Sequence, residues 1–159
     1  MTPVTKHHEG AEIVMLIKSK NVVDQRNVFY TDDNGYLLQR RQKDYREGYN
    51  LKYDIKVAYN YYPITSMVFI ENPETKQRLT LLTDRPQGVT SLEKGEIEVM
   101  IHRVCLMDDG RGVGEVLREK GNEYEGGDRN NLLPVSTRHV LHFSQPGTLH
   151  ITINIHPPR

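Results

Sequence analysis

The sequence predicts an all-β fold, an antiparallel β-sandwich, and three observations support this prediction. Short apolar runs alternate with clusters of turn-forming residues at intervals of roughly 8–12 residues, which is typical of antiparallel sandwiches. Within Glu96–Val104, apolar and polar residues alternate, so that Ile97, Val99 and Ile101 share one face of a half-buried strand. No amphipathic segment is long enough to supply the helical crossovers that a parallel sheet requires.

The predicted strands are segments in which apolar or aromatic residues stand between turn signals. In chain order they are residues 12–17, 28–30, 36–38, 64–70, 79–83, 96–104, 140–143 and 149–155. Asn34 and Gly35 tolerate positive φ angles and therefore predict a tight hairpin turn between the second and third of these strands. Further turns are predicted at 71–74 and 93–95, a connection at 43–50, a short helical turn at 115–120 and an exposed loop at 122–131.

Composition limits the classes of partner. The chain has 159 residues, which fits one domain or part of a larger one, with 21 basic and 21 acidic residues and no net charge. A neutral balance predicts neither nucleic-acid nor anionic-membrane binding, and no apolar run approaches the ~20 residues of a membrane span. Residues 1–10 are polar, so we expect a disordered extension without a signal peptide, followed by one β region over 11–159.

Histidine and cysteine do not form a recognisable metal or nucleophile site. His139 and His142 are three residues apart, which places them on opposite faces of a strand. Cys105 and His102 have the same spacing near a strand end and have no third group to orient the histidine. We therefore expect no metal ion and no catalytic residue in this chain.

A glycine-rich loop at residues 108–115 is the most distinctive local feature. Its glycines miss the Gly-x-Gly-x-x-Gly spacing of dinucleotide-binding loops by one residue, so nucleotide binding is not predicted. Gly110 and Gly112 flank Arg111, whose planar guanidinium can donate paired hydrogen bonds. Either Arg111 binds sugar hydroxyls or a carboxylate of an adjoining domain, or it is merely solvated.

Asp108 and Asp109 precede these glycines, but they do not resemble the acid pair of a glycosidase. A retaining glycosidase holds its two carboxyl groups about 5 Å apart on opposite sides of one bond. Adjacent residues at a strand end point to opposite faces and converge poorly on one sugar. We expect both aspartates to brace the glycine loop instead.

Several motifs in the same order resemble glycoside hydrolase family 38, the class II α-mannosidases. Phe-Tyr-Thr-Asp-Asp-Asn-Gly at 29–35 is similar to the family signature Phe-Tyr-Thr-Asp-x-Asn-Gly. The other motifs are Lys-Asp-Tyr-Arg at 43–46, Asn-Tyr-Tyr-Pro-Ile at 60–64, Leu-Thr-Leu-Leu-Thr-Asp-Arg-Pro-Gln-Gly at 79–88, Ser-Leu at 91–92 and Glu-Val-Met-Ile-His-Arg at 98–103. The resemblance is strongest over 12–117 and looks more like the lysosomal acid enzymes than the Golgi enzymes.

This resemblance implies a fold, a reaction and a partner. Family members cleave terminal α-mannosyl residues of glycans with retention, through a glycosyl-aspartate and with the help of zinc. The nucleophile and the zinc ligands lie in an N-terminal α/β barrel and a helical region, which would be the partners of this chain. The chain itself resembles part of the C-terminal β supersandwich, related in fold to galactose mutarotase. The isolated chain is then expected to be inactive.

The resemblance also assigns a role to the glycine-rich loop. In the family, the arginine of an Asp-Asp-x-Arg-Gly loop reaches the active-site region, and the matching residue here is Arg111, supported by Asp108, Asp109, Gly110 and Gly112. A lysosomal or other acidic lumenal location is implied for the parent enzyme. The alternatives are a stand-alone β-sandwich that binds carbohydrate or protein without catalysis, and a degenerate remnant.

Overall fold

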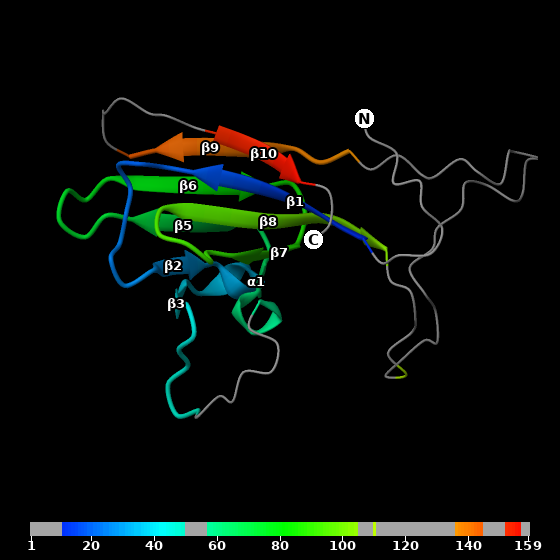
Figure 1. The fold of residues 1–159 in the computed structure, drawn as a ribbon, viewed down its shortest axis with the longest axis horizontal. Helices are drawn as coiled ribbons and strands as arrows, with labels where there is room; N and C mark the ends of the chain where they lie inside the picture. Colours follow the sequence, from blue (N-terminus) through cyan, green and yellow to red (C-terminus); the bar gives the residue numbers. More distant parts are fainter. Residues whose placement is uncertain (1–10, 50–56, 105–109, 111–135, 145–151, 157–159) are drawn as a thin grey trace, which may run out of the picture.

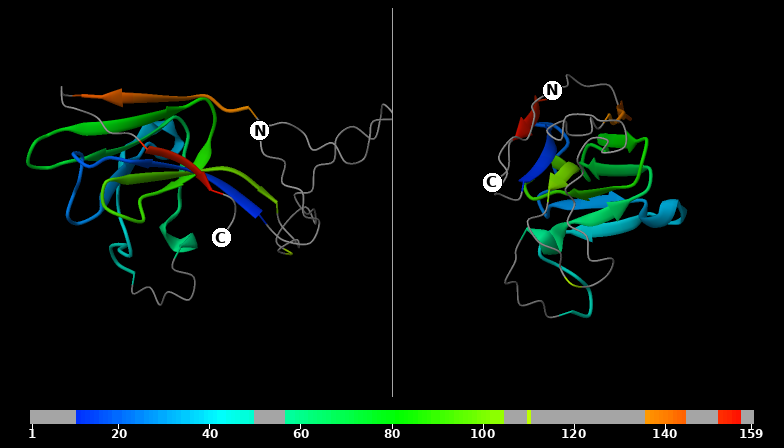
Figure 2. Two further views of the ribbon diagram at one scale, coloured as in Figure 1. Left: turned by 45° about the horizontal axis from the view of Figure 1, so that its top comes forward. Right: turned by 90° about the vertical axis from the view of Figure 1, so that its right-hand side faces the viewer.

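The computed structural model describes residues 11–49, 57–104, 110, 136–144 and 152–156. These residues form two antiparallel β-sheets packed as the layers of a sandwich, seen from three directions in Figures 1 and 2. The predicted all-β antiparallel sandwich is confirmed. Within the described ranges, no helix is long and apolar enough to cross a bilayer.

Each sheet has five described strands. The first sheet has the strand order β10-β1-β8-β7-β4, with bounds Thr152–His156, Ala11–Lys18, Glu96–Val104, Gln87–Thr90 and Tyr62–Ile64. The second sheet has the order β3-β2-β5-β6-β9, with bounds Gln39–Gln42, Val28–Thr31, Met67–Glu71, Arg78–Thr83 and His139–Phe143. The short helical segments α1 (Asp33–Tyr36) and η1 (Ala58–Asn60) lie in connections.

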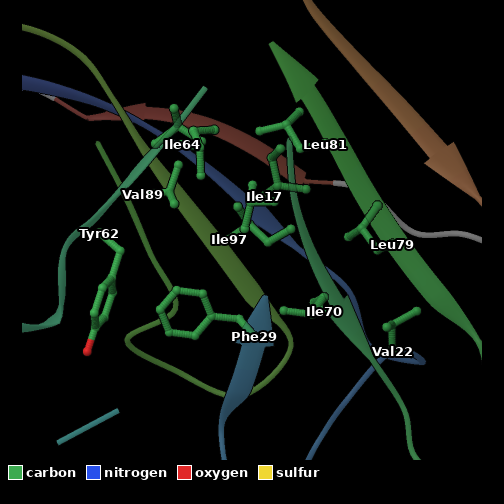
Figure 3. Close-up of a cluster of buried hydrophobic side chains, with 12 residues drawn as sticks. Ile17, Val22, Phe29, Tyr62, Ile64, Ile70, Leu79, Leu81, Val89 and Ile97 are labelled. Atoms are coloured by element: carbon green, nitrogen blue, oxygen red, sulfur yellow. The ribbon is translucent and has the colours of Figure 1, made fainter. Parts of the chain in front are cut away.

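The core lies between the two sheets and takes buried side chains from strands of both sheets, among them β1, β2, β4, β5, β6, β7 and β8. In β8, Ile97 and Val99 are completely buried and Ile101 packs at the edge of the core, which confirms the predicted period-two strand. In β6, Leu79 and Leu81 meet them from the second sheet (Figure 3). Burial of these side chains provides most of the favourable free energy that holds the layers together.

The predicted single strand 64–70 is wrong, because the chain changes sheet within it. β4 ends at Ile64 in the first sheet, and β5 begins at Met67 in the second. The carboxylate of buried Asp32 accepts hydrogen bonds from the backbone N–H of Thr65 (2.8 Å) and of Ser66 (2.7 Å), and another from the Ser66 hydroxyl. These bonds satisfy backbone donors that leave one ladder before joining the next.

The hairpin after β2 is longer than predicted. The expected strand 36–38 is wrong, since Tyr36 belongs to α1 and the partner of β2 is β3, which begins at Gln39. Asn34 and Gly35 do adopt positive φ angles, +62° and +68°, as the turn prediction requires. These left-handed residues mean that α1 is a pair of tight turns rather than a regular helix.

Most other predicted elements are confirmed and, besides β3, one further strand was missed. β1, β6, β8 and β9 cover the predicted segments within one residue at either end, and β10 overlaps the last one. The turn at 93–95 is present, with Gly95 at φ +75°. The missed strand is β7, whose Gln-Gly-Val-Thr sequence carries one large apolar residue and is recruited by pairing with β8. The predictions for 1–10, 115–120 and 122–131 lie outside the described residues.

Replacing Asp32 by asparagine should make the domain less stable and less sensitive to acid. Burial raises the pKa of Asp32, but hydrogen bonds from Ser66, Thr65 and Met67 outweigh it, so the pKa falls below 3.8. A carboxylate with a lowered folded-state pKa stabilises the fold above about pH 4, and this contribution is lost as the pH falls through the lowered value. We expect a loss of roughly 1–3 kcal/mol near neutral pH that shrinks as the pH falls through the lowered pKa of Asp32, measured by urea unfolding.

Asp33→Asn is the matched control for this experiment. Asp33 contacts Arg41 at 3.0 Å but is about one third exposed, so its ion pair contributes little. If the Asp32 variant is destabilised equally at neutral and acidic pH, the charge of the carboxylate does not stabilise the segment at Thr65 and Ser66 where the chain changes sheet.

Candidate functional site: a glycine-rich loop and an arginine–tyrosine cleft

Of the residues predicted for the sugar-binding loop, the structure describes Gly110. Asp108, Asp109, Arg111 and Gly112 lie outside the described residues. Gly110 is exposed and has φ +69°, in the left-handed region that favours glycine. This agrees with the expectation that glycine shapes the loop, whereas the substrate-binding role of Arg111 stays a prediction.

The strand that precedes the loop in the sequence is β8. β8 is an inner strand of the first sheet, paired on one side with β1 and on the other with β7. Its Ile97 and Val99 are anchored in the core, and the strand ends at Val104, shortly before the loop. The structure thus describes the strand before the loop, whereas the loop itself, apart from Gly110, lies outside the described residues.

A second constellation joins β3, β4 and the connection that follows β3. Tyr62 of β4 lies between two arginines, with the guanidinium carbon of Arg41 4.4 Å and that of Arg46 5.1 Å from its ring centroid. Arg46 also donates to the Tyr62 hydroxyl at 3.2 Å and to the Tyr59 carbonyl at 2.9 Å. Arg41 is held further by Thr31 and Asp33.

These residues border a cleft with a volume of about 360 Å³. Its described lining consists of Arg40, Arg41, Gln42, Tyr45, Arg46, Glu47, Tyr49 and Tyr62. The Tyr62 ring is buried at the edge of the core and makes an edge-to-face contact with Phe29 at 5.8 Å, so the ring is part of the fold. The contacts that Arg41 and Arg46 make are therefore mainly structural, whereas Tyr45 and Tyr49 are more than half exposed.

Sequence reasoning did not find this cleft. The connection predicted at 43–50 is confirmed over the described residues 43–49, which follow β3, but that prediction assigned no binding surface to them. The arginines meet Tyr62 because β3 and β4 belong to different sheets that approach each other at this edge. No local spacing in the sequence signals such a contact.

The histidines of β9 take different environments. His139 is half-buried, with its Nε2 atom 2.7 Å from Gln87 Oε1, whereas His142 is exposed, in agreement with the predicted opposite faces. Burial lowers the pKa of His139 below 6.5, while Asp84 acts against this shift and Arg85 adds to it. Within the described part of the chain, no group of three or more His, Cys, Asp or Glu residues is arranged to hold a metal ion.

Comparison with known proteins connects this fold to one family. Residues 7–111 match the model of the glycosyl hydrolases family 38 C-terminal domain, a stretch that includes β1 to β8. The chain is 48% identical over 113 residues to lysosomal alpha-mannosidase of Cavia porcellus, and 45% identical over 112 residues to that of Felis catus. It is 40% identical over 111 residues to alpha-mannosidase of Canavalia ensiformis.

The coverage of these alignments is unequal. They include 70–71% of this chain but 11% of each relative, so the chain corresponds to about a tenth of their length. The matched region contains the hairpin motif at 29–35, the arginine–tyrosine cleft and β8 up to Gly110 and Arg111. From this match and the two-sheet fold, the chain belongs to glycosyl hydrolase family 38 and corresponds to part of that family's C-terminal domain.

Proposed function

We propose that this chain is part of a retaining α-mannosidase that hydrolyses terminal α-mannosyl residues of glycans in a lysosomal or other acidic lumenal compartment. The observation that carries the proposal is the family match over residues 7–111, together with relatives that are all named alpha-mannosidases. In this proposal the chain supplies a β scaffold and the loop that carries Arg111. The catalytic barrel and the helical region of the parent enzyme are its partners.

The chemistry proposed for the loop is binding rather than bond cleavage. The Arg111 guanidinium would donate paired hydrogen bonds to sugar hydroxyls or to an active-site carboxylate, with Asp108 and Asp109 as supports. A fixed base on β8 suits this task, because a binding residue must keep its position while the substrate changes.

The nucleophile and the zinc ion are assigned to the part of the parent enzyme outside this chain. The described residues do not fit a zinc site, because no three potential ligands converge among them. The isolated chain is proposed to be inactive toward α-mannosides.

The proposal can be tested by immunodepletion. An antibody raised against this chain is added to an extract of source cells, and hydrolysis of a chromogenic α-mannoside is measured at acidic pH before and after removal of the antibody. We expect α-mannosidase activity to be depleted, and excess recombinant chain to block the depletion. β-Galactosidase activity is the internal control. Full retention of α-mannosidase activity in the extract would favour the stand-alone binding module.

Arg111→Ala in the full-length parent enzyme should lower kcat/KM by about tenfold or more, since one charged donor is removed from the active-site region. Zinc content should remain unchanged, because no zinc ligand is altered. Arg111→Lys should recover part of the loss, since a single charge remains without the paired geometry. Arg103→Ala, which removes an exposed arginine of β8, is the matched control. Unchanged kinetics in Arg111→Ala would remove this residue from the site.

A further inference from the structure

The tip of the β2–β3 hairpin exposes three consecutive large apolar side chains. Tyr36 is 93% exposed, Leu37 58% and Leu38 49%. In a soluble surface such runs are avoided unless they serve a function, because exposed apolar groups favour association. We call these three residues the hairpin knob; they are the last residue of α1 and the two residues between α1 and β3 (Figure 1).

The backbone that carries the hairpin knob is held in place by contacts of the two aspartates that precede it, Asp32 and Asp33. Asp32 ties it to the sheet crossing through Thr65 and Ser66, as described above. The carbonyl of Asp32 accepts the N–H of Gly35 at 2.8 Å, and Asp33 pairs with Arg41 at 3.0 Å. A rigid support lowers the entropy lost when an exposed segment docks, so the hairpin knob is pre-organised for binding.

The chemistry of the hairpin knob suits a protein partner better than a sugar. Leu37 and Leu38 offer no hydrogen bonds and no flat ring, whereas sugar sites combine aromatic faces with converging polar groups. An aromatic side chain such as that of Tyr36 is instead a type enriched in protein interfaces, whose buried core is more apolar than the remaining surface. The matching binding partner is therefore a protein with an apolar pocket on its surface.

The remainder of the parent enzyme is the partner that the comparisons favour. This chain corresponds to about a tenth of the length of its relatives, and the hairpin knob lies inside the matched stretch 7–111. We propose that Tyr36, Leu37 and Leu38 dock into an apolar socket on the catalytic part of the same α-mannosidase polypeptide. This inference rests on the proposed function and adds the surface through which the β domain holds its partner.

Photo-cross-linking in the natural polypeptide identifies the occupant. Leu37 is replaced by the photoreactive residue p-benzoylphenylalanine, and the control carries the same residue at Glu74, in the exposed turn between β5 and β6. After irradiation, peptide mapping should show Leu37→p-benzoylphenylalanine joined to the catalytic part of the same polypeptide, at a yield at least about tenfold above the control. Cross-links to a second copy, to other segments of this chain or to solvent products alone would overturn the proposal.

Hydroxyl-radical labelling gives a second readout without any substitution. Tyr36 should be modified at least about tenfold more slowly in the native polypeptide than in the same sample unfolded in urea, because docking would bury a ring that is 93% exposed here. Similar rates in both samples would overturn docking. Immunodepletion of α-mannosidase activity is independent of both readouts, so depletion without protection of Tyr36 rejects the hairpin knob alone, while failed depletion rejects the proposed function.

Discussion

Phe29→Ala is expected to lower the free energy of unfolding by about 3–5 kcal/mol, which is the usual cost of removing a large buried aromatic ring. Phe29 is completely buried in β2 and lies between the two sheets, where it contacts the Tyr62 ring edge-to-face at 5.8 Å (Figure 3). Its removal leaves a cavity beside the arginine–tyrosine cleft. Because domains of this size are stable by about 5–15 kcal/mol, this loss is a large fraction of the total stability.

Phe29→Leu distinguishes the contribution of the aromatic ring contact from the contribution of the buried apolar volume. Leucine keeps much of the buried apolar surface but loses the contact with Tyr62, so we expect roughly a third of the alanine effect. Both variants are measured by urea unfolding followed by circular dichroism. An alanine variant within about 1 kcal/mol of the wild type would contradict the core described here.

Gly95→Ala is expected to be nearly as damaging, at about 2–5 kcal/mol. Gly95 has φ +75°, a conformation that costs an alanine roughly 1–2 kcal/mol. An added Cβ would also lie 2.5 Å from the backbone oxygen of Ser19 and 3.2 Å from a methyl group of Val23. The clash adds a further 1–3 kcal/mol or so, since the backbone of Ser19 is tied to Gly95 by a 2.8 Å hydrogen bond and cannot easily move.

Gly48→Ala isolates the contribution of the clash. Gly48 has nearly the same φ angle, +76°, but no described atom lies within 4 Å of its Cβ position. The alanine there should cost only the conformational strain of about 1–2 kcal/mol. The difference between the two variants measures the close approach of the β7–β8 turn to the segment after β1, and equal losses would contradict that packing.

Local sequence patterns predicted those parts of the fold in which burial or backbone conformation depends on neighbouring residues in the sequence. In β8, alternation alone placed Ile97 and Val99 in the core. The left-handed Asn34 and Gly35 were also predicted, because their backbone preference is local. The same reasoning failed at Thr65 and Ser66, where the chain changes sheet because Asp32, over thirty residues away, supplies the hydrogen bonds.

In the candidate site, too, features that depend on adjacent residues were predicted, whereas contacts between residues far apart in the sequence were not. Gly110 of the predicted loop adopts a positive φ angle, whereas Arg111 lies outside the described residues. The arginine–tyrosine cleft arises where β3 and β4 approach from different sheets, so no motif in the chain signals it. The exposure of Tyr36 likewise follows from a hairpin that is longer than its Asn-Gly turn predicted.

The mass of the natural polypeptide tests the central claim most directly. An antibody against this chain is used to immunoblot source-cell fractions that are assayed in parallel for acid α-mannosidase activity. The account predicts a band far above the 18.4 kDa of this chain that co-purifies with the activity. A band at that mass, free of activity and of any bound polypeptide carrying a catalytic barrel, would contradict it.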